Sequence, residues 1–323
     1  MKTSYAENKI LHGSALDKLK ELESESVDCI ITSPPYYALR DYKVDGQIGN
    51  EKTIDEYVDK LIAVFTEAKR VLKKEGTCWI VLGDTYSGGG NDRNGINNTL
   101  ACRVRSVDYK AISKPKRDSI FSPKTLCMVP ERFAIKMIDN GGWILRNKII
   151  WKKNNCMPSS AKDRFTIDYE FIYFFTKSKK YYFKTQYEPL QKSSIERIKK
   201  GFITDDTKYD NIKRDTGVGN LRNGSNPSIT PDSRIKRCVW TINTKPFAEA
   251  HFAVFPEELV KQCLDAGCPE NGIVLDMFMG AGTTALVALK HNRKFVGIEL
   301  NPDYVDMAMK RIDPYLKQQK IIT

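Results

Sequence analysis

Four consecutive residues, Ser33-Pro34-Pro35-Tyr36, bring together groups that could bind a planar ring carrying an amine. They offer a serine hydroxyl, backbone carbonyls and an aromatic ring, and the two prolines hold the segment in extended geometry. The mainly apolar run 27–31 before them is typical of a buried parallel strand, and open α/β sheets bind ligands at the carboxyl ends of such strands. The alternative is a proline-rich strand terminator with Tyr36 packed in the core.

A second stretch, residues 273–299, has the pattern of a strand, a glycine turn and a helix. Gly280 and Gly282 permit a ligand to approach the N–H groups at the start of the helix predicted over 283–290. Glu299 ends the next apolar strand, 19 residues after Gly280. That is near the spacing at which an acidic side chain binds ribose hydroxyls, so the stretch predicts a nucleotide-like cofactor.

Together the two stretches resemble the amino-methyltransferases that act on DNA. The first is similar to their catalytic loop, (Asp/Asn/Ser)-Pro-Pro-(Tyr/Phe), and Phe278 to Gly282 is similar to their cofactor loop, Phe-x-Gly-x-Gly. The catalytic loop comes first, as in the circularly permuted β class of that family. The resemblance covers most of the chain and weakens at about residues 85–125 and 185–235. It implies S-adenosylmethionine as the cofactor and double-stranded DNA as the partner, and it leaves open a cognate restriction endonuclease and a monomer or homodimer.

The resemblance also implies the roles of individual residues. The catalytic residues would be Ser33, Pro34, Pro35 and Tyr36. The cofactor-binding residues would be Thr32, Asp276, Phe278, Gly280, Gly282, Thr283, Glu299 and Asn301, and no metal is expected. The chain departs from the family at Ser14, where relatives usually carry the aspartate that reaches the cofactor adenine. Asp17 is a candidate substitute.

The expected reaction is methyl transfer to the exocyclic amine of a DNA base. That amine is a weak nucleophile because its lone pair is delocalised into the ring, so acceptors must hold both of its N–H groups in line with the methyl donor. Ser33 Oγ and the Pro34 carbonyl are the expected acceptors, with Tyr36 stacked on a base flipped out of the duplex. In the resembling family, serine at this position usually accompanies cytosine N4 and aspartate adenine N6. We therefore expect cytosine N4, with adenine N6 as the alternative.

Other functions compete with this one. Carbon-5 methylation of cytosine needs a cysteine nucleophile, usually after proline, and the chain has no Pro-Cys pair. Methylation of a protein glutamine or an RNA base would be favoured by Asn-Pro-Pro-Tyr rather than by the loop with Ser33. A DNA-binding module with a vestigial catalytic fold is opposed by the intact set of Phe278, Gly280, Gly282 and Glu299.

The net charge of +12 is concentrated in the middle of the chain. Residues 85–245 contain 32 Lys and Arg against 15 Asp and Glu, whereas 1–84 and 246–323 are mildly acidic. A positive charge concentrated in one part of the chain predicts contacts with DNA phosphates and an affinity for DNA that falls with salt. Residues 177–237 are predicted to form a target-recognition lobe, because aromatic residues are interleaved with basic ones there. These aromatic residues are Tyr181, Tyr182, Phe183, Tyr187, Phe202 and Tyr209.

The predicted fold is an α/β, Rossmann-like methyltransferase sheet, circularly permuted, with the recognition lobe inserted. Residues 1–176 would form a catalytic half and 238–323 a cofactor-binding half, with 86–124 as a mobile loop. Apolar periodicity predicts helices near 16–22, 53–72, 130–140 and 257–266, and strands near 77–82, 143–151 and 169–175. No regular element is predicted within 177–237.

The remaining features predict a cytoplasmic protein, encoded by a prokaryote or by a phage. The eight cysteines form no CxxC pair and are expected to be free thiols. No apolar run is long enough for a membrane span, and the N-terminus lacks a signal-peptide core. His12 and His251 are expected to be structural, and Asp84 either shapes the pocket or caps a turn.

Overall fold

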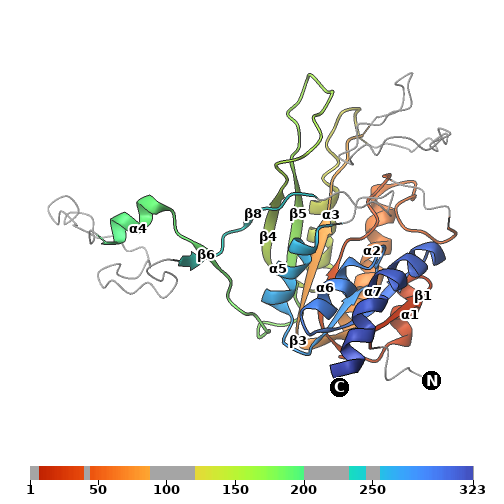
Figure 1. Ribbon diagram of the computed structural model, residues 1–323. Helices are drawn as coiled ribbons and strands as arrows, with labels where there is room; N and C mark the ends of the chain where they lie inside the picture. Colours follow the sequence, from red (N-terminus) through yellow and green to blue (C-terminus); the bar gives the residue numbers. More distant parts are fainter. Residues whose placement is uncertain (1–6, 40–43, 88–120, 200–232, 245–254, 323) are drawn as a thin grey trace. The chain divides into compact units, whose positions relative to one another are not determined.

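The computed structural model describes residues 7–39, 44–87, 121–199, 233–244 and 255–322. The chain divides into two compact units, one formed by Met1–Phe183 with Cys238–Thr323 and the other by Lys184–Arg237 (Figure 1). The predicted mobile loop and the histidine at 251 fall largely or wholly outside the described residues, as do Phe202 and Tyr209.

The larger unit contains a sheet of eight strands that joins the two ends of the chain. Its order is β1 (Lys9–His12), β10 (Lys294–Glu299), β9 (Ile273–Asp276), β2 (Val27–Thr32), β3 (Leu72–Leu82), β5 (Tyr169–Thr176), β4 (Ile144–Lys152) and β8 (Val239–Thr241). Strand β5 is antiparallel to both neighbours, and the other pairs are parallel. The predicted mostly parallel α/β sheet is therefore confirmed.

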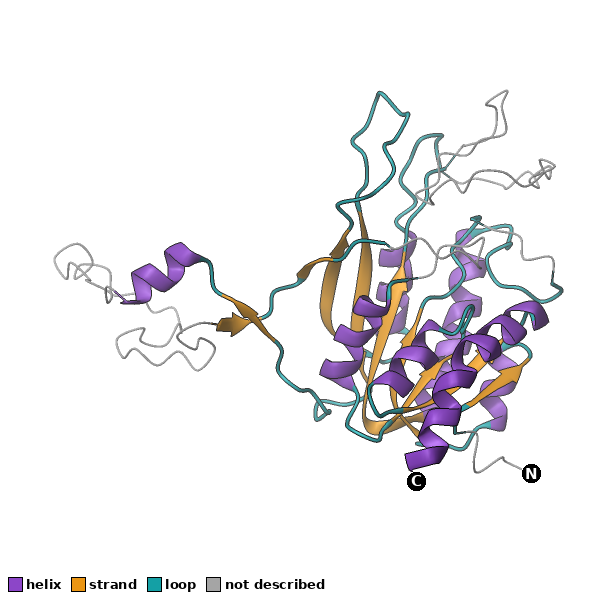
Figure 2. Cartoon of the chain, in the orientation of Figure 1, coloured by secondary structure: helices purple, strands orange, loops and turns teal. Residues whose placement is uncertain are grey.

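Helices cover both faces of this sheet (Figure 2). The first face carries α1 (Ala15–Glu21), α2 (Ile54–Val71) and α3 (Val129–Asp139), and the second carries α5 (Glu257–Gly267), α6 (Thr283–Lys290) and α7 (Pro302–Ile322). The helix predicted over 53–72 forms as α2. Thr53 caps it, accepting a hydrogen bond from Glu56 N at 3.1 Å while the Glu56 carboxylate accepts from Thr53 N at 3.3 Å.

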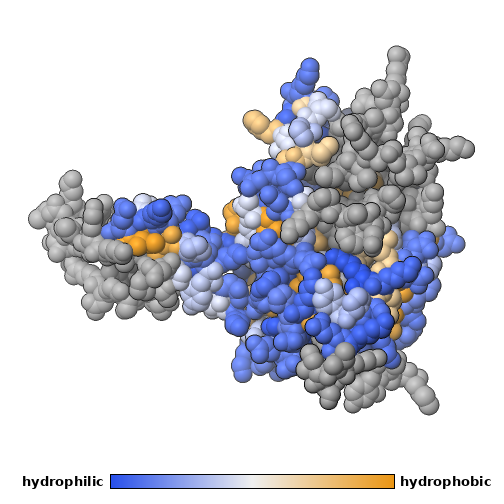
Figure 3. Space-filling view, viewed as in Figure 1, coloured by the Kyte–Doolittle hydropathy of each residue, from blue (hydrophilic) through white to orange (hydrophobic). Residues whose placement is uncertain are grey.

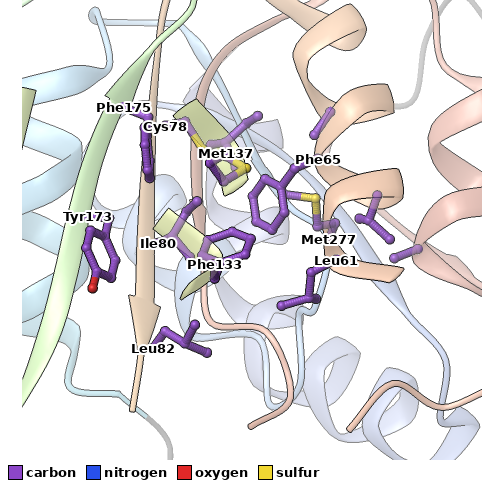
Figure 4. Close-up of a cluster of buried hydrophobic side chains, with 14 of the residues drawn as sticks. Leu61, Phe65, Cys78, Ile80, Leu82, Phe133, Met137, Tyr173, Phe175 and Met277 are labelled. Atoms are coloured by element: carbon purple, nitrogen blue, oxygen red, sulfur yellow. The ribbon is translucent and has the colours of Figure 1, made fainter. Parts of the chain in front are cut away.

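The core of the first face explains why these helices lie where they do. Helices α2 and α3 meet through Phe65 and Phe133, whose ring centroids are 5.2 Å apart. Figure 4 shows these side chains facing residues of β3 and β5 across a continuous apolar layer. The labelled members are Leu61, Phe65, Cys78, Ile80, Leu82, Phe133, Met137, Tyr173, Phe175 and Met277. Burying this layer holds α2 and α3 against β3 and β5.

Strands β2 and β9 lie side by side although they come from opposite ends of the chain, with Ile30 opposite Leu275. After β2 the chain continues to α2 on the first face, and after β9 it continues to α6 on the second. The chain thus departs to opposite faces from two neighbouring strands. Such a switch point opens a crevice at the carboxyl ends of the strands, and the two predicted loops both begin there.

The smaller unit contains regular elements that the sequence does not predict. Strands β6 (Tyr187–Pro189) and β7 (Ser233–Ile235) pair antiparallel, and α4 (Lys192–Lys199) follows β6. Glu188 on β6 accepts hydrogen bonds from Arg234 at 2.9 Å and Arg237 at 2.7 Å. The prediction of no regular structure in 177–237 is wrong for these segments. The three-residue strands are too short to show a period of two, and the eight residues of α4 include only two apolar residues, Ile195 and Ile198.

Three further features complete the description. The visible outward face of α7 is mostly hydrophilic (Figure 3). Over the described part of the chain, no helix combines the length and apolar character needed to cross a bilayer. The seven cysteines located there are free thiols.

Candidate functional site

A buried carboxylate joins the two predicted loops. Thr32 Oγ1, at the end of β2, donates a hydrogen bond of 2.7 Å to Asp276 Oδ1, at the end of β9. Asp276 also accepts from Phe278 N at 3.1 Å and from Thr284 Oγ1 at 2.6 Å. Burial raises the pKa of Asp276 to about 6, although the hydrogen bonds from Thr284 and Thr32 oppose the rise.

This placement changes the roles expected of Thr32 and Asp276. The sequence predicts that both contact the cofactor, but both side chains are fully buried and bonded to each other. Buried in this way they link the two loops, and their contact with the cofactor stays a prediction. The sequence could not show this, because their hydrogen bond spans 244 positions.

The two glycines of the second loop have different surroundings. Both adopt left-handed backbone conformations, with φ of 53° at Gly280 and 77° at Gly282. A Cβ on Gly282 would lie 2.9 Å from the Cβ of Ala308 on α7, so packing requires glycine there. A Cβ on Gly280 would meet nothing closer than the Phe278 carbonyl at 4.0 Å. The space beside Gly280 is the part of the turn open to a ligand.

Glu299 is held at the end of β10 by two backbone donors. Its carboxylate accepts from Gly280 N at 2.7 Å and from Asn301 N at 2.9 Å. Burial raises the pKa of Glu299, and these hydrogen bonds oppose the rise. A carboxylate has about four lone-pair positions. The half-buried side chain therefore keeps acceptor capacity for a pair of neighbouring hydroxyls while fixing the glycine turn.

Three further predicted cofactor residues have structural partners. Thr283 is buried, and its hydroxyl accepts a hydrogen bond from Arg311 at 2.9 Å. The Asn301 side chain accepts from Asp303 N at 2.9 Å at the start of α7. Phe278 packs against the first-face core. Thr283 and Phe278 therefore support the loop from inside, whereas the Asn301 side chain caps α7.

The turn after β1 lies beside Glu299, because Gly13 N donates to the Glu299 carbonyl at 2.9 Å. Ser14 caps α1, accepting from Asp17 N at 3.2 Å, and its hydroxyl donates to the Asp17 carboxylate at 2.7 Å. The suggested substitute, Asp17, is thus engaged in this cap. His12 lies 3.1 Å from the Leu300 carbonyl, which accords with a structural role.

The first loop is held from several directions. The Pro35 carbonyl accepts a hydrogen bond from the Tyr57 hydroxyl at 2.8 Å, whereas no donor among the described residues reaches the Pro34 carbonyl. Pro34 is buried and Ser33 is half-buried at the same edge of the sheet. Of the two prolines, Pro34 has the carbonyl available as an acceptor.

Tyr36 is fixed at both its hydroxyl and its ring. The hydroxyl donates to Glu170 Oε2 at 2.6 Å. The ring lies on Gly83, where an added Cβ would be 2.6 Å from Tyr36 Cε2. Burial, followed by the negative charge of Glu170, raises the pKa of the Tyr36 phenol, and a hydrogen bond with the Ser33 side chain opposes this. The tyrosine therefore stays protonated near neutral pH.

Sequence reasoning missed Glu170 and Gly83 as parts of the site. Glu170 is the only acidic residue in β5, an otherwise mainly apolar strand, and this is the signal that could have drawn attention to it. Asp84, for which two roles were predicted, is a cap. Its carboxylate accepts from Thr85 N at 2.8 Å and from Met128 N and Val129 N at 3.0 Å each, at the start of α3.

Comparison with known proteins gives a consistent result. The N6/N4 methyltransferase family model, described as DNA methylase, matches residues 27–310. The Type II methyltransferase M.Cfr9I of Citrobacter freundii is 38% identical over 303 residues, which cover 94% of this chain and 87% of that protein.

Solved structures share the fold at lower identity. The cytosine-N4-specific PvuII DNA methyltransferase has a TM-score of 0.60 at 18% identity, covering 98% of this chain and 93% of its own. The complex of M1.HpyAVI with S-adenosylmethionine has a TM-score of 0.52 at 20% identity, covering 94% and 98%.

Proposed function

The chain belongs to the DNA methylase family of N6 and N4 methyltransferases, and from this premise we propose that it methylates the N4 amine of a cytosine flipped out of duplex DNA. Its membership makes it an S-adenosylmethionine-dependent, site-specific DNA methyltransferase. The observation that carries the proposal is the juxtaposition, through Thr32 and Asp276, of a loop with amine acceptors and a loop suited to the cofactor.

The residues around the glycine turn fit S-adenosylmethionine. Gly280 leaves open space for a ligand, and Glu299 offers carboxylate lone pairs that suit the two hydroxyls of a ribose. We assign the direct contacts to these two residues. Thr32, Asp276, Gly282 and Thr283 then support the turn from behind, and the Asn301 side chain caps α7. When bound, the cofactor supplies a methyl group activated by its sulfonium.

The first loop would prepare the amine for attack. Ser33 Oγ and the Pro34 carbonyl accept hydrogen bonds from its two N–H groups. These bonds draw the nitrogen from planar towards tetrahedral sp³ geometry, in which its lone pair can attack. Tyr36 stacks on the flipped base, and its own hydroxyl remains bonded to Glu170. These residues orient the amine, which gives up one proton as it takes the methyl group. Ser33 Oγ, which accepts from that N–H, would pass the proton to solvent.

Cytosine N4 is proposed over adenine N6 because residue 33 is serine. Either a serine hydroxyl or an aspartate carboxylate could accept from an amine, so the preference rests on the usual association within the family. Mass spectrometry of nucleosides from DNA methylated in vitro tests it. N4-methylcytosine is expected. N6-methyladenine as the sole product would change the assigned target base to adenine, and the reaction would still be methylation of an exocyclic amine. Absence of any methylated base would favour the binding-module alternative.

We further propose a division of labour along the chain. Residues 1–176 carry the catalytic loop, 238–323 the cofactor loop, and 177–237 read the DNA sequence. The basic character of the middle of the chain supports this assignment. The name of M.Cfr9I, a Type II methyltransferase, supports a restriction endonuclease that shares the recognition sequence.

A further inference from the structure

The side chain of Glu170 lies almost completely buried at the beginning of β5 and has two partners. It accepts the hydrogen bond from the Tyr36 hydroxyl at 2.6 Å, and Lys153 forms an ion pair with its other oxygen. The side chains of Lys153 and Glu170 are only 14% and 10% exposed. The Lys153 ammonium also lies 4.1 Å from the centroid of the Trp151 ring. This is a desolvated, fully partnered network rather than a surface ion pair.

The network closes around one aromatic ring. Tyr36 follows β2, Gly83 follows β3, Glu170 begins β5, and Lys153 follows β4. Gly83 supports the ring, because any side chain there would overlap it, and Glu170 holds the hydroxyl. Four strands therefore determine where the ring of the catalytic loop lies.

Burying this charge costs desolvation free energy that an apolar residue would avoid. Its presence therefore suggests a role that an apolar side chain could not fill. The χ1 torsion of a tyrosine sets where its ring lies, and χ2 sets the tilt of the ring. A hydrogen bond from the hydroxyl to a carboxylate is strong and directional, and it fixes χ1. The hydroxyl oxygen lies on the χ2 axis, so the tilt is limited instead by the contact of the ring with Gly83. Lys153 neutralises the carboxylate, so the bond is maintained without an unpaired charge.

We propose that Glu170 is a positioning residue, which with Lys153 holds the Tyr36 ring in the orientation that receives the flipped base. The inference rests on the proposed function for its purpose, but the restraint on the ring exists without substrate. Because Glu170 touches neither base nor cofactor in this scheme, it acts only through Tyr36.

Three variants test the proposal by kinetics. Tyr36→Phe keeps the ring and removes the hydroxyl. Glu170→Gln keeps one acceptor oxygen, and the double variant Glu170→Leu with Lys153→Met removes both charges together, so that neither is left buried alone. We expect kcat to fall about 10- to 100-fold in Tyr36→Phe and in the double variant, the range for a hydrogen bond to a charged group. Glu170→Gln should retain more activity, and cofactor affinity should be unchanged.

The decisive comparison is the triple variant, which combines Tyr36→Phe with Glu170→Leu and Lys153→Met. If Glu170 acts through the tyrosine hydroxyl, adding Tyr36→Phe to the double variant should cause no further loss of kcat, because the same bond is already broken. Independent, multiplying losses would overturn the proposal. So would wild-type kcat in Tyr36→Phe.

A second measurement does not depend on activity. In protein labelled with 3-fluorotyrosine, the Tyr36 resonance can be assigned by its loss in Tyr36→Phe. It should shift and narrow in the Glu170→Leu, Lys153→Met protein as the ring is released, and it should not move in Tyr37→Phe, which removes a neighbouring hydroxyl bonded to the Lys52 carbonyl. An unchanged resonance in the double variant would overturn the positioning role. Failure of the wild-type protein to methylate DNA would instead overturn the proposed function, and the resonance would still test the restraint.

Discussion

The hydroxyl of Thr32 donates to the carboxylate of Asp276 at 2.7 Å, and through this bond the strand before the Ser33–Tyr36 loop is tied to the strand before the glycine turn. Both side chains are fully buried. In the proposed methyl transfer the acceptor amine and the methyl donor must meet in line, so the spacing of these loops would determine the reaction geometry. The bond is a structural link between the two proposed binding loops.

Replacing Thr32 with valine should weaken this link. Valine has nearly the same shape but no donor, so Asp276 loses one of its hydrogen bonds in a buried position. We expect the free energy of unfolding to fall by about 1–3 kcal/mol and cofactor affinity to fall with it. Urea denaturation and calorimetry measure the two effects. Thr66→Val is the matched control, since Thr66 on α2 bonds only to the Ile62 carbonyl at an exposed position, and it should change stability by no more than about 0.5 kcal/mol.

The raised pKa of Asp276 predicts that the stability of the folded protein decreases as the pH rises. With a pKa of about 6 in the folded protein, this carboxyl binds its proton more tightly when folded than when unfolded. Its contribution to stability is therefore greatest at low pH and is lost as the pH rises through 6. Asp276→Asn removes this titration, so between pH 4.5 and 7.5 the variant should gain about 2 kcal/mol relative to wild type. Equal pH profiles of the unfolding free energy would show that Asp276 does not titrate in this range.

The two glycines of the cofactor loop should respond differently to alanine. Gly282→Ala combines a strained φ with a collision against Ala308, so we expect a loss of about 2–5 kcal/mol of stability. Gly280→Ala has the φ penalty alone, about 1–2 kcal/mol, but its methyl group would occupy the open space assigned to the cofactor. The Gly280→Ala protein should therefore fold, but it should bind S-adenosylmethionine poorly.

A compensating change checks the collision. Combining Gly282→Ala with Ala308→Gly should recover part of the lost stability beyond the sum of the single effects, because the two Cβ atoms would otherwise lie 2.9 Å apart. Simple additivity in the double variant would show that α7 moves away without cost.

The sequence predicts the elements of this fold better than their partners. Helix α6 lies over residues 283–290 as predicted, because a glycine turn and an apolar run mark it locally. The neighbouring positions of β2 and β9 are not readable from either strand, since parallel pairing over such a separation leaves no local pattern. The family resemblance supplies that relation instead.

The same distinction applies to the site. Ser33, Pro34, Tyr36, Gly280 and Glu299 are found at one edge of the sheet as expected. Asp276 and Thr283 are predicted by the same resemblance, but burial turns them inward, and burial depends on packing that the sequence does not display. Glu170 was missed because its partner, Tyr36, lies 134 positions away.

Sequence choice should move with residues 177–237. Replacing this segment with that of a relative of different specificity should transfer the recognition sequence, because contacts to base edges determine specificity and we assign those contacts to this segment. Sequencing of methylated positions after expression of the hybrid measures the outcome. A hybrid that folds, methylates DNA and keeps the original site would place recognition elsewhere, with loop 86–124 as the next segment to exchange.

Glu299 should determine cofactor affinity more than stability. Its carboxylate accepts from Gly280 N and Asn301 N and retains lone pairs for the ribose hydroxyls, so Glu299→Ala removes both the acceptor and the anchor of the glycine turn. We expect a loss of about 1.5–3 kcal/mol in binding of S-adenosylmethionine or its demethylated product, measured by calorimetry.

Glu270→Ala is the control, because Glu270 is an exposed acid just before the other end of β9. Urea unfolding of both variants separates a loosened fold from a lost contact. Because the backbone donors of Gly280 and Asn301 can turn to water, the unfolding free energy of Glu299→Ala should fall by less than its binding free energy. Wild-type affinity in Glu299→Ala would contradict the assignment of the ribose to this carboxylate.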